Sequence, residues 1–218
     1  MKNIYIYCEG QTEESFIDNV LFPYLLNLGI YVRPIVCQTK RTQARKYKGG
    51  VNSYIKIRTE LSILCKQHRN EIITTMFDYY GMPNDTPGIT KLTRGLYKKV
   101  VSIEKAIEAD IGMRNLFFNL TVHEFEGLLF TDTSAFQIIT DNNTIICLQD
   151  IRKGFASPEH INNSNDTAPS KRLESLIPGY SKVLNGTALS KRIGIDSMIA
   201  ECEHFRNWIR KIKAISEI

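Results

Sequence analysis

Over roughly the first 130 residues, the apolar positions follow two alternating patterns. Short runs of apolar and β-prone residues have the length and composition of buried strands, and they lie at 3–8, 31–37, 72–77 and 116–122. Between these runs, apolar residues recur at helical spacing over 11–29, 51–68 and 97–110. Strands that alternate with helices favour a parallel sheet with crossover helices. We therefore predict an α/β fold.

The pattern changes after residue 131. The stretch 154–169 is rich in Ser, Asn and Pro and has no periodicity, and only short helical segments follow it. We therefore predict an α/β domain over 1–135 and a loop-rich, helical C-terminal extension over 136–218 that packs on it.

Composition narrows the class of protein. Of the 218 residues, 43% are hydrophobic and 23% charged, as in ordinary globular proteins. We find no basic-then-apolar leader and no apolar run near the roughly 18 residues that suggest a membrane span. The five cysteines are scattered without a CxxC pair, which is typical of reduced thiols. We expect a cytoplasmic protein without a membrane segment.

Basic residues are concentrated in two stretches without Asp or Glu, between Asn19 and Thr59 and between Thr86 and Ile103. Such stretches suit the phosphate backbone of a nucleic acid; a solvated basic face is the alternative. A polar loop over 38–50 belongs to the first stretch. Its predicted nucleic-acid contacts are Lys40, Arg41, Arg45, Lys46 and Lys48.

An acid follows each of two predicted strands directly. Glu9 comes after the first strand and Asp78 after the third. If these strands are parallel neighbours about 4.8 Å apart, both carboxylates emerge at the same sheet edge and can share one hard cation. Oxygen ligands favour Mg²⁺ or Mn²⁺. The alternative is that each acid caps a helix or begins a turn.

Further acids lie close to these positions in the predicted fold. Glu13, one helical turn after Glu9, is a candidate third ligand or general base; the alternative is that it complements the helix dipole. Glu124 and Glu126 follow the strand at 116–122 and are candidates to complete the metal site or hold a metal-bound water. The alternative is an acidic first turn of the next helix.

Basic side chains near a metal site can offset the charge that develops on phosphorus. Lys171, Arg172 and Lys182 are the candidates, and for Lys182 the pattern favours a solvated position. The sequence has no GxxxxGK[ST], GxSxG or HExxH motif. It therefore does not predict a self-contained NTPase, a serine hydrolase or a zinc protease.

The motifs resemble a known family. The matching segments are CEGQTEE, FDYYGMPNDTPG, HEFEGLLF, SPEHIN, PSKR, IPGYSK and CEHFRNW. They resemble domain-of-unknown-function family 4276, and the strand–Glu9 and strand–Asp78 arrangement resembles the Toprim fold of topoisomerases, primases and overcoming-lysogenization-defect nucleases. The resemblance implies a Toprim-like three-layer fold, with a mainly parallel sheet of about four strands, helices on both faces and a C-terminal helical extension.

The resemblance also implies roles for individual residues. Glu9 would be the metal-site glutamate and general acid/base, and Asp78 the first aspartate of an Asp-x-Asp element. Tyr80 stands where the second aspartate is expected. Either Glu124, Glu126 or Asp85 replaces that aspartate, or the protein binds a single ion.

These expectations combine into a nuclease that hydrolyses DNA or RNA. Glu9 and Asp78 would hold Mg²⁺ or Mn²⁺, with Glu13, Glu124, Glu126 and Lys171 assisting in catalysis and Arg172 in nucleic-acid binding. Kinship implies a separately encoded ATPase partner in phage-defence or mobile-element loci, and a homodimer is left open. The alternative is a non-catalytic module that binds nucleic acid or the ATPase, and a primase-like activity ranks last.

Overall fold

The computed structural model describes residues 3–37, 53–162 and 166–216. The five basic residues predicted to grip nucleic acid from the loop at 38–50 lie outside these ranges. Their role stays a prediction.

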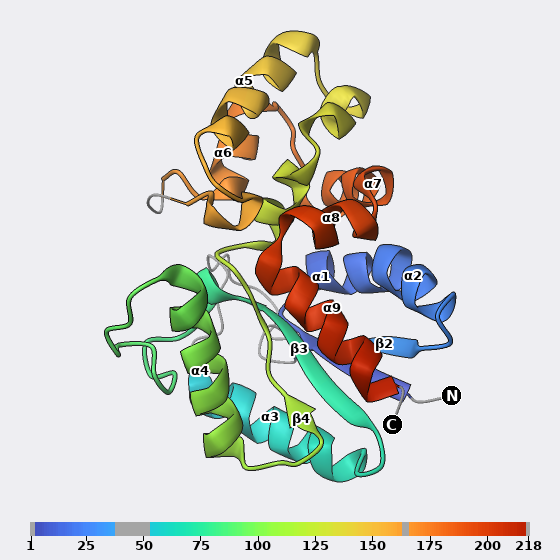
Figure 1. Cartoon of the computed structure of the whole chain (residues 1–218), viewed down its shortest axis with the longest axis vertical. Helices are drawn as coiled ribbons and strands as arrows, with labels where there is room; N and C mark the ends of the chain where they lie inside the picture. Colours follow the sequence, from blue (N-terminus) through green and yellow to red (C-terminus); the bar gives the residue numbers. More distant parts are fainter. Residues whose placement is uncertain (1–2, 38–52, 163–165, 217–218) are drawn as a thin grey trace, which may run out of the picture.

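A parallel sheet forms the centre of the protein (Figure 1). Its order is β2-β1-β3-β4, and β5 also pairs with β3. All four strand pairings are parallel. The bounds are β1 Asn3–Cys8, β2 Tyr31–Val36, β3 Ile72–Asp78, β4 Leu116–Phe117 and β5 Leu120–Thr121. The predicted, mainly parallel sheet of about four strands is confirmed.

The predicted strand over 116–122 is interrupted in its middle. Thr75 of β3 faces the gap between β4 and β5, where its hydroxyl donates to the Asn119 carbonyl at 2.7 Å. The Asn119 N–H in turn lies 2.8 Å from the same hydroxyl oxygen and donates to it. A side chain thus takes the place of ladder hydrogen bonds, which satisfies the buried backbone groups at the break.

Helices cover both faces of the sheet. The bounds are α1 Gln11–Phe16, η1 Ile17–Leu21, α2 Phe22–Leu26, α3 Tyr54–Gln67, η3 Tyr79–Gly81, α4 Leu96–Ile111, η4 Phe125–Thr131, η5 Thr133–Ile138, α5 Asn142–Lys153, η6 Pro158–His160, α6 Pro169–Leu176, α7 Lys182–Ile193, α8 Ile195–Glu201 and α9 Glu203–Ser216. The alternation of β1 divides the core: Ile4 and Ile6 belong to the cluster under α1, α2 and α9, and Tyr7 to the cluster under α3 and α4. The predicted three-layer fold is confirmed.

The predicted helix over 11–29 is broken into three pieces. A π-helical segment, η1, separates α1 from α2, and Pro23 lies in the first turn of α2. Proline has no N–H to continue the helical hydrogen bonds, which explains why the helix changes its winding just before Pro23.

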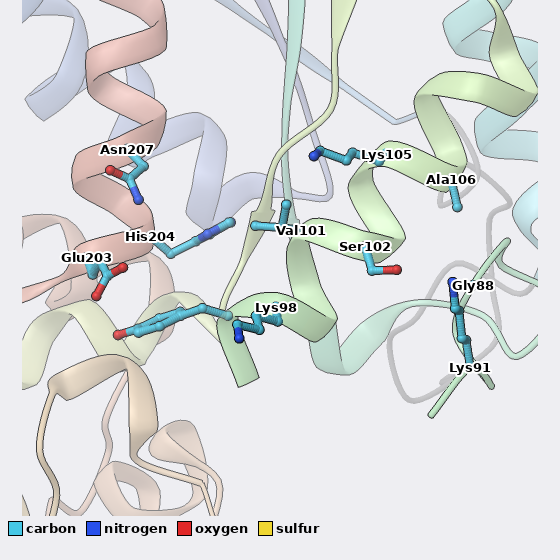
Figure 2. Close-up of a pocket in the computed structure, with 11 residues that line it drawn as sticks. Gly88, Lys91, Lys98, Val101, Ser102, Lys105, Ala106, Glu203, His204 and Asn207 are labelled. Carbon is cyan, nitrogen blue, oxygen red and sulfur yellow. The ribbon is translucent and has the colours of Figure 1, made fainter. Parts of the chain in front are cut away.

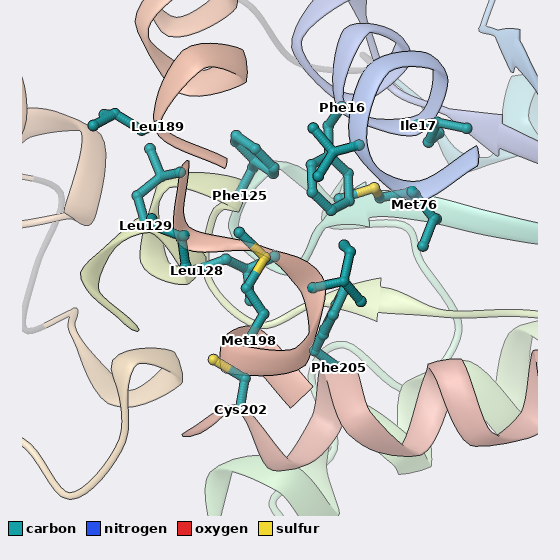
Figure 3. Packing of buried hydrophobic residues seen from close by; sticks show 14 of the residues in the cluster. Phe16, Ile17, Met76, Phe125, Leu128, Leu129, Leu189, Met198, Cys202 and Phe205 are labelled. Carbon is teal, nitrogen blue, oxygen red and sulfur yellow. The ribbon is translucent and has the colours of Figure 1, made fainter. Parts of the chain in front are cut away.

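Helix α9 joins the C-terminal region to the sheet. Phe205, Trp208, Ile209 and Ile212 are buried at helical spacing, and the Trp208 indole N–H donates to the Thr74 hydroxyl at 2.9 Å. Figure 3 shows that side chains from both sides of residue 135 pack in one cluster. The predicted division into two units at that residue stays a prediction.

The SPEHIN motif has a structural part in this region. Glu159, which is 3% exposed, accepts hydrogen bonds from the backbone N–H groups of His204 and Phe205 at 2.9 Å each. It also accepts one from the Tyr97 hydroxyl at 2.9 Å. Its carboxylate therefore caps the first turn of α9, where the helix dipole favours negative charge.

The buried side chains of Glu104 and His204 connect the helix layers on the two faces of the sheet. Glu104 of α4 accepts a hydrogen bond from the Leu120 N–H at 2.8 Å and lies 2.8 Å from Nε2 of His204 on α9. Helices on opposite faces of the sheet thus meet beyond its last strand. Within the described ranges, we find no helix long and apolar enough to cross a membrane.

Candidate functional site

An acidic cleft lies at the carboxyl ends of β1 and β3. These strands are parallel neighbours, and the pairing continues past β1 because the Glu9 N–H donates to the Met76 carbonyl at 3.2 Å. The cleft has a volume of about 690 Å³. It is lined by Glu9, Gly10, Gln11, Thr12, Glu13, Asp78, Tyr80, Gly81, Glu124, Ser170, Lys171 and Lys182. Glu9 and Asp78, which are sixty-nine positions apart, thus line the same cleft.

The turn after β1 orients Glu13. Its Oε2 accepts a hydrogen bond from the Gly10 N–H at 2.9 Å, and α1 begins at Gln11. Gly10 is therefore the N-cap of α1. Glu13 is only 7% exposed. It supports the helix start and lines the cleft, and its role as a ligand or general base stays a prediction.

Asp78 is held from the opposite side. Its Oδ1 accepts a hydrogen bond from the Phe125 N–H at 3.0 Å, which fixes the start of η4 against the end of β3. The Tyr80 N–H donates to the His123 carbonyl at 3.1 Å. His123 has φ 60°, a strained conformation for a residue with a side chain. This strain lies directly before Glu124.

The two glutamates of the HEFEGLLF motif have different surroundings. Glu124 lines the cleft, and its Oε2 accepts a hydrogen bond from the Ser170 N–H at the start of α6 at 3.0 Å. Glu126 is 1% exposed and lies behind the cleft, with its Oε1 3.3 Å from Nζ of Lys182. Lys182 is therefore an ion-pair partner of a buried acid, while 40% of its own side chain is exposed.

The other predicted basic residues are held by nearby contacts. Lys171 lines the cleft, and its ammonium forms an exposed ion pair with Glu174 at 2.6 Å. Arg172 donates to the Thr167 carbonyl at 2.7 Å and lies over the Phe155 ring at 5.7 Å from its centre. Arg172 does not line the cleft, and its contact with nucleic acid stays a prediction.

Asp85, one of the three candidates for the missing second aspartate, has another task. Its carboxylate accepts hydrogen bonds from the Tyr54 N–H at 3.0 Å and from the Ser53 hydroxyl at 3.1 Å. These bonds stabilise the N-terminus of α3. Of the three candidates, Glu124 is the one that lines the cleft.

Crowded, poorly solvated carboxylates dominate the electrostatics of the cleft. Burial and the neighbouring Glu9 raise the pKa of Glu13 to about 7. Burial, Glu13 and Glu9 also raise the pKa of Asp78 well above its usual value. Burial raises the pKa of Glu126, against the opposing effect of Lys182. A cation placed among these groups would relieve their repulsion.

This repulsion predicts how stability depends on pH. Because the folded pKa of Glu13 is raised above 4.5 to about 7, its contribution is complete below about pH 4.5 and is lost as the pH rises through about 7. We expect the free energy of unfolding of the wild type, relative to Glu13→Gln, to fall by on the order of 2 kcal/mol between pH 5 and 8.

Urea unfolding of both proteins in EDTA, at a series of pH values, measures this difference. The comparison with Glu13→Gln is needed because His123 also makes the free energy of unfolding depend on pH. Burial lowers the pKa of His123 to about 4, so its effect on that free energy has the opposite sign below about pH 6.5. A difference that stays constant or grows with pH would contradict the expected repulsion.

The donor set fits a hard cation only with help from substrate or water. Among the residues that the structure describes, no group of three or more His, Cys, Asp or Glu is arranged to hold a metal ion. The carboxylates of Glu13 and Glu124 each accept a backbone hydrogen bond. Asp78 also accepts one, from the Phe125 N–H at 3.0 Å. Mg²⁺ commonly binds through one or two carboxylates together with waters and substrate phosphates. Glu9 and Asp78 remain the predicted pair for this mode because they follow adjacent parallel strands and line the same cleft.

Gly81 leaves room for the Glu9 carboxylate. A Cβ at position 81 would lie 3.1 Å from Oε2 of Glu9, so Gly81→Ala should displace this carboxylate. Because Glu9 is a predicted metal ligand, we expect about tenfold weaker Mn²⁺ binding in calorimetry. The free energy of unfolding should change by less than about 1 kcal/mol. Unchanged Mn²⁺ affinity would show that this contact does not position Glu9.

The fold and the cleft define an α/β protein with an acidic site at the carboxyl edge of a parallel sheet. Comparison with family models shows that the chain belongs to the family described as "Domain of unknown function (DUF4276)", whose model matches residues 8–213. The predicted family is thus confirmed. No curated protein and no solved structure matches the chain.

Proposed function

We propose that this protein is a divalent-metal-dependent nuclease that hydrolyses the phosphodiester backbone of DNA or RNA in a Toprim-like cleft. The observation that carries the proposal is the position of Glu9 and Asp78 at the ends of adjacent parallel strands, in one cleft with Glu124 and Lys182. Ligands bind at the carboxyl edge of open α/β sheets in general.

Each residue of the cleft has a task in this reaction. Glu9 and Asp78 would hold Mg²⁺ or Mn²⁺, which when bound polarises the phosphate and makes a water more nucleophilic. Glu13, with its pKa of about 7, is suited to accept the proton of the attacking water near neutral pH. Glu124 orients that water from the facing wall of the cleft, and Glu126 acts indirectly by holding Lys182.

Lys182 is better suited than Lys171 to stabilise charge on the phosphate. Burial lowers the pKa of Lys182, but the nearby acids Glu126, Glu124 and Asp78 raise it by more. The net shift of the pKa is therefore upward, and the ammonium stays charged. Lys171 has a carboxylate partner at the exposed rim. A fixed ammonium in a partly buried site stabilises developing negative charge better than a solvated one.

The setting of the reaction follows from the family resemblance. We propose a cytoplasmic protein that works with a separately encoded ATPase in phage defence or in a mobile element, and a homodimer is one assembly to test. Size-exclusion chromatography with light scattering reports the oligomeric state.

The second candidate function is a non-catalytic module that binds nucleic acid or the ATPase. The observation that favours it is Tyr80, a cleft residue that is 42% exposed and stands where a second metal-binding aspartate is expected. Calorimetric titration with Mn²⁺ separates the two functions. Salt-sensitive nucleic-acid binding without Mn²⁺ binding would support the module.

The direct test is cleavage of plasmid DNA and of single-stranded RNA by the purified protein with Mg²⁺ or Mn²⁺, with EDTA as the control. Cleavage that needs the metal supports the nuclease. If the protein binds both metals but leaves both substrates intact, the nuclease proposal is contradicted.

A further inference from the structure

A second hollow, separate from the acidic cleft, lies over the outer face of α4. It has a volume of about 640 Å³ and runs between α9 and the loop at 88–91. We call it the α4 trough. Figure 2 shows Lys98, Val101 and Lys105 on α4, with residues of α9 on one side and Gly88 and Lys91 on the other.

Lysines stand along the middle of this trough. Lys98 and Lys105 are seven residues apart on α4, so they follow each other about 10.5 Å apart along one helix face, and Lys91 adds a third ammonium from the loop. Within the described part of the chain, Lys91 and Lys98 form no ion pair with a carboxylate. Three like charges in one hollow favour an anionic ligand.

The acids of α4 have partners elsewhere, and of the three lysines only Lys105 interacts with one of them in the described part of the chain. Glu104 is buried against Leu120 and His204. Glu108 accepts a hydrogen bond from the Phe118 N–H at 2.8 Å. In this position it also interacts electrostatically with Lys105. Asp110 accepts hydrogen bonds from Arg58 and Tyr54. The exposed Glu203 stands on the α9 wall, so an anion is favoured on the lysine side.

The loop that carries Lys91 is built into the fold. Nζ of Lys99 donates to the carbonyl of Gly88 at 3.1 Å, to that of Ile89 at 2.6 Å and to that of Lys91. Gly88 has φ +78°, and a Cβ there would lie 3.3 Å from Cβ of Ala106. The loop is thus held close to α4, and binding requires little new ordering of this wall.

Two side chains of α4 next to α9, Tyr97 and Val101, offer surfaces for bases and sugars. Tyr97 is held by its hydroxyl on Glu159, and its ring lies nearly parallel to that of His204. Val101 is partly exposed beside it. Aromatic and apolar surface beside a row of lysines is the combination that binds a nucleic-acid strand without reading its sequence.

We infer that the α4 trough is a nucleic-acid binding surface, in which Lys91, Lys98 and Lys105 contact the phosphates of a DNA or RNA strand. A strand bound here would be held outside the acidic cleft while another part of it reaches the metal-binding carboxylates. The choice of ligand rests on the proposed function, but the binding itself needs neither metal nor catalysis.

Fluorescence anisotropy tests this inference with labelled single-stranded DNA, single-stranded RNA and duplex DNA, in EDTA so that no cleavage occurs. For Lys98→Glu/Lys105→Glu we expect at least about tenfold weaker binding, and a salt dependence whose slope falls by about two. The matched control is Lys66→Glu/Lys191→Glu, which makes the same charge change at exposed positions of α3 and α7, outside the trough and outside both basic stretches of the sequence. The control should stay within about twofold of the wild type.

Lys98→Gln/Lys105→Gln, which removes the charges without adding acids, should give an intermediate loss, and thermal unfolding checks that each variant is folded. Two results would overturn the inference: a wild type that binds none of the three nucleic acids, or a trough variant that binds as well as its control. The outcome is independent of the nuclease proposal. If binding depends on the trough lysines but no cleavage occurs, only the nuclease proposal is contradicted. If cleavage and binding are unchanged in the lysine variants, only the proposed binding surface is contradicted.

Discussion

Glu9→Gln combined with Asp78→Asn is expected to lower metal-dependent cleavage by about a thousandfold or more, which corresponds to about 4 kcal/mol of transition-state stabilisation. The two carboxylates come from the ends of adjacent parallel strands and line the same cleft. Their removal takes away the charged oxygen ligands of the proposed cation. Gel assays of plasmid and RNA cleavage, at several Mg²⁺ and Mn²⁺ concentrations, measure the loss.

The same double variant should remain folded. Asn keeps the carbonyl oxygen that accepts from the Phe125 N–H, and loss of charge relieves the repulsion that raises the pKa of Asp78. We therefore expect a free energy of unfolding at pH 8 that is no lower than that of the wild type. Cleavage that survives in this folded variant would remove the nuclease proposal for this cleft.

Glu14→Gln combined with Asp18→Asn is the matched control for this experiment. It also removes two negative charges, one from α1 and one from η1, at positions that do not line the cleft. Its cleavage should stay within about threefold of the wild type. A loss as large as that of the cleft variant would mean that net charge, rather than metal binding, controls the reaction.

The local pattern of the sequence was sufficient to predict the centre of the site. The runs that become β1 and β3 are apolar, β-prone and directly followed by an acid, so the sheet edge and two of its carboxylates could be predicted without coordinates. The sheet order itself depends on packing between distant segments. It decides that β1 and β3 are neighbours, which the sequence pattern only suggested.

Long-range contacts explain what sequence reasoning missed. The role of Glu159 depends on α9, whose first turn begins more than forty residues later, and the local pattern shows only a loop acid. Gly81 follows two tyrosines and is typical of a turn, and its lack of a side chain leaves room for the Glu9 carboxylate. The glycine itself was the available signal, since glycine often marks a close backbone approach.

Lys182 is the residue whose interpretation changed most, and the fold explains the change. It lies at the start of α7, fifty-six positions after Glu126, so no spacing rule connects the two. It follows a Pro-Gly turn, where a basic side chain is commonly solvated, and 40% of that side chain is indeed exposed. The buried Glu126 makes the difference, because an unpaired carboxylate there would be costly.

Lys182→Met is therefore expected to act on both stability and activity. It leaves Glu126, which is 1% exposed, without its ion-pair partner. Loss of one member of a buried pair costs about 3 kcal/mol or more, and the exposure of the lysine reduces this to about 2 kcal/mol here. We also expect a loss of about a hundredfold or more in kcat, because the variant lacks the ammonium that faces the phosphate. Lys171→Met, which breaks only an exposed pair, should change both by little.

A double-variant cycle with Glu126→Gln separates the two effects of Lys182. In the Glu126→Gln background the buried charge is absent, so Lys182→Met should cost little further stability, with a coupling of about 1 kcal/mol or more in urea unfolding. Activity should not be restored, because the glutamine gives no replacement for the ammonium. If cleavage recovers together with stability in Glu126→Gln/Lys182→Met, Lys182 is a structural residue only, and the charge that stabilises the phosphate must come from elsewhere in the cleft.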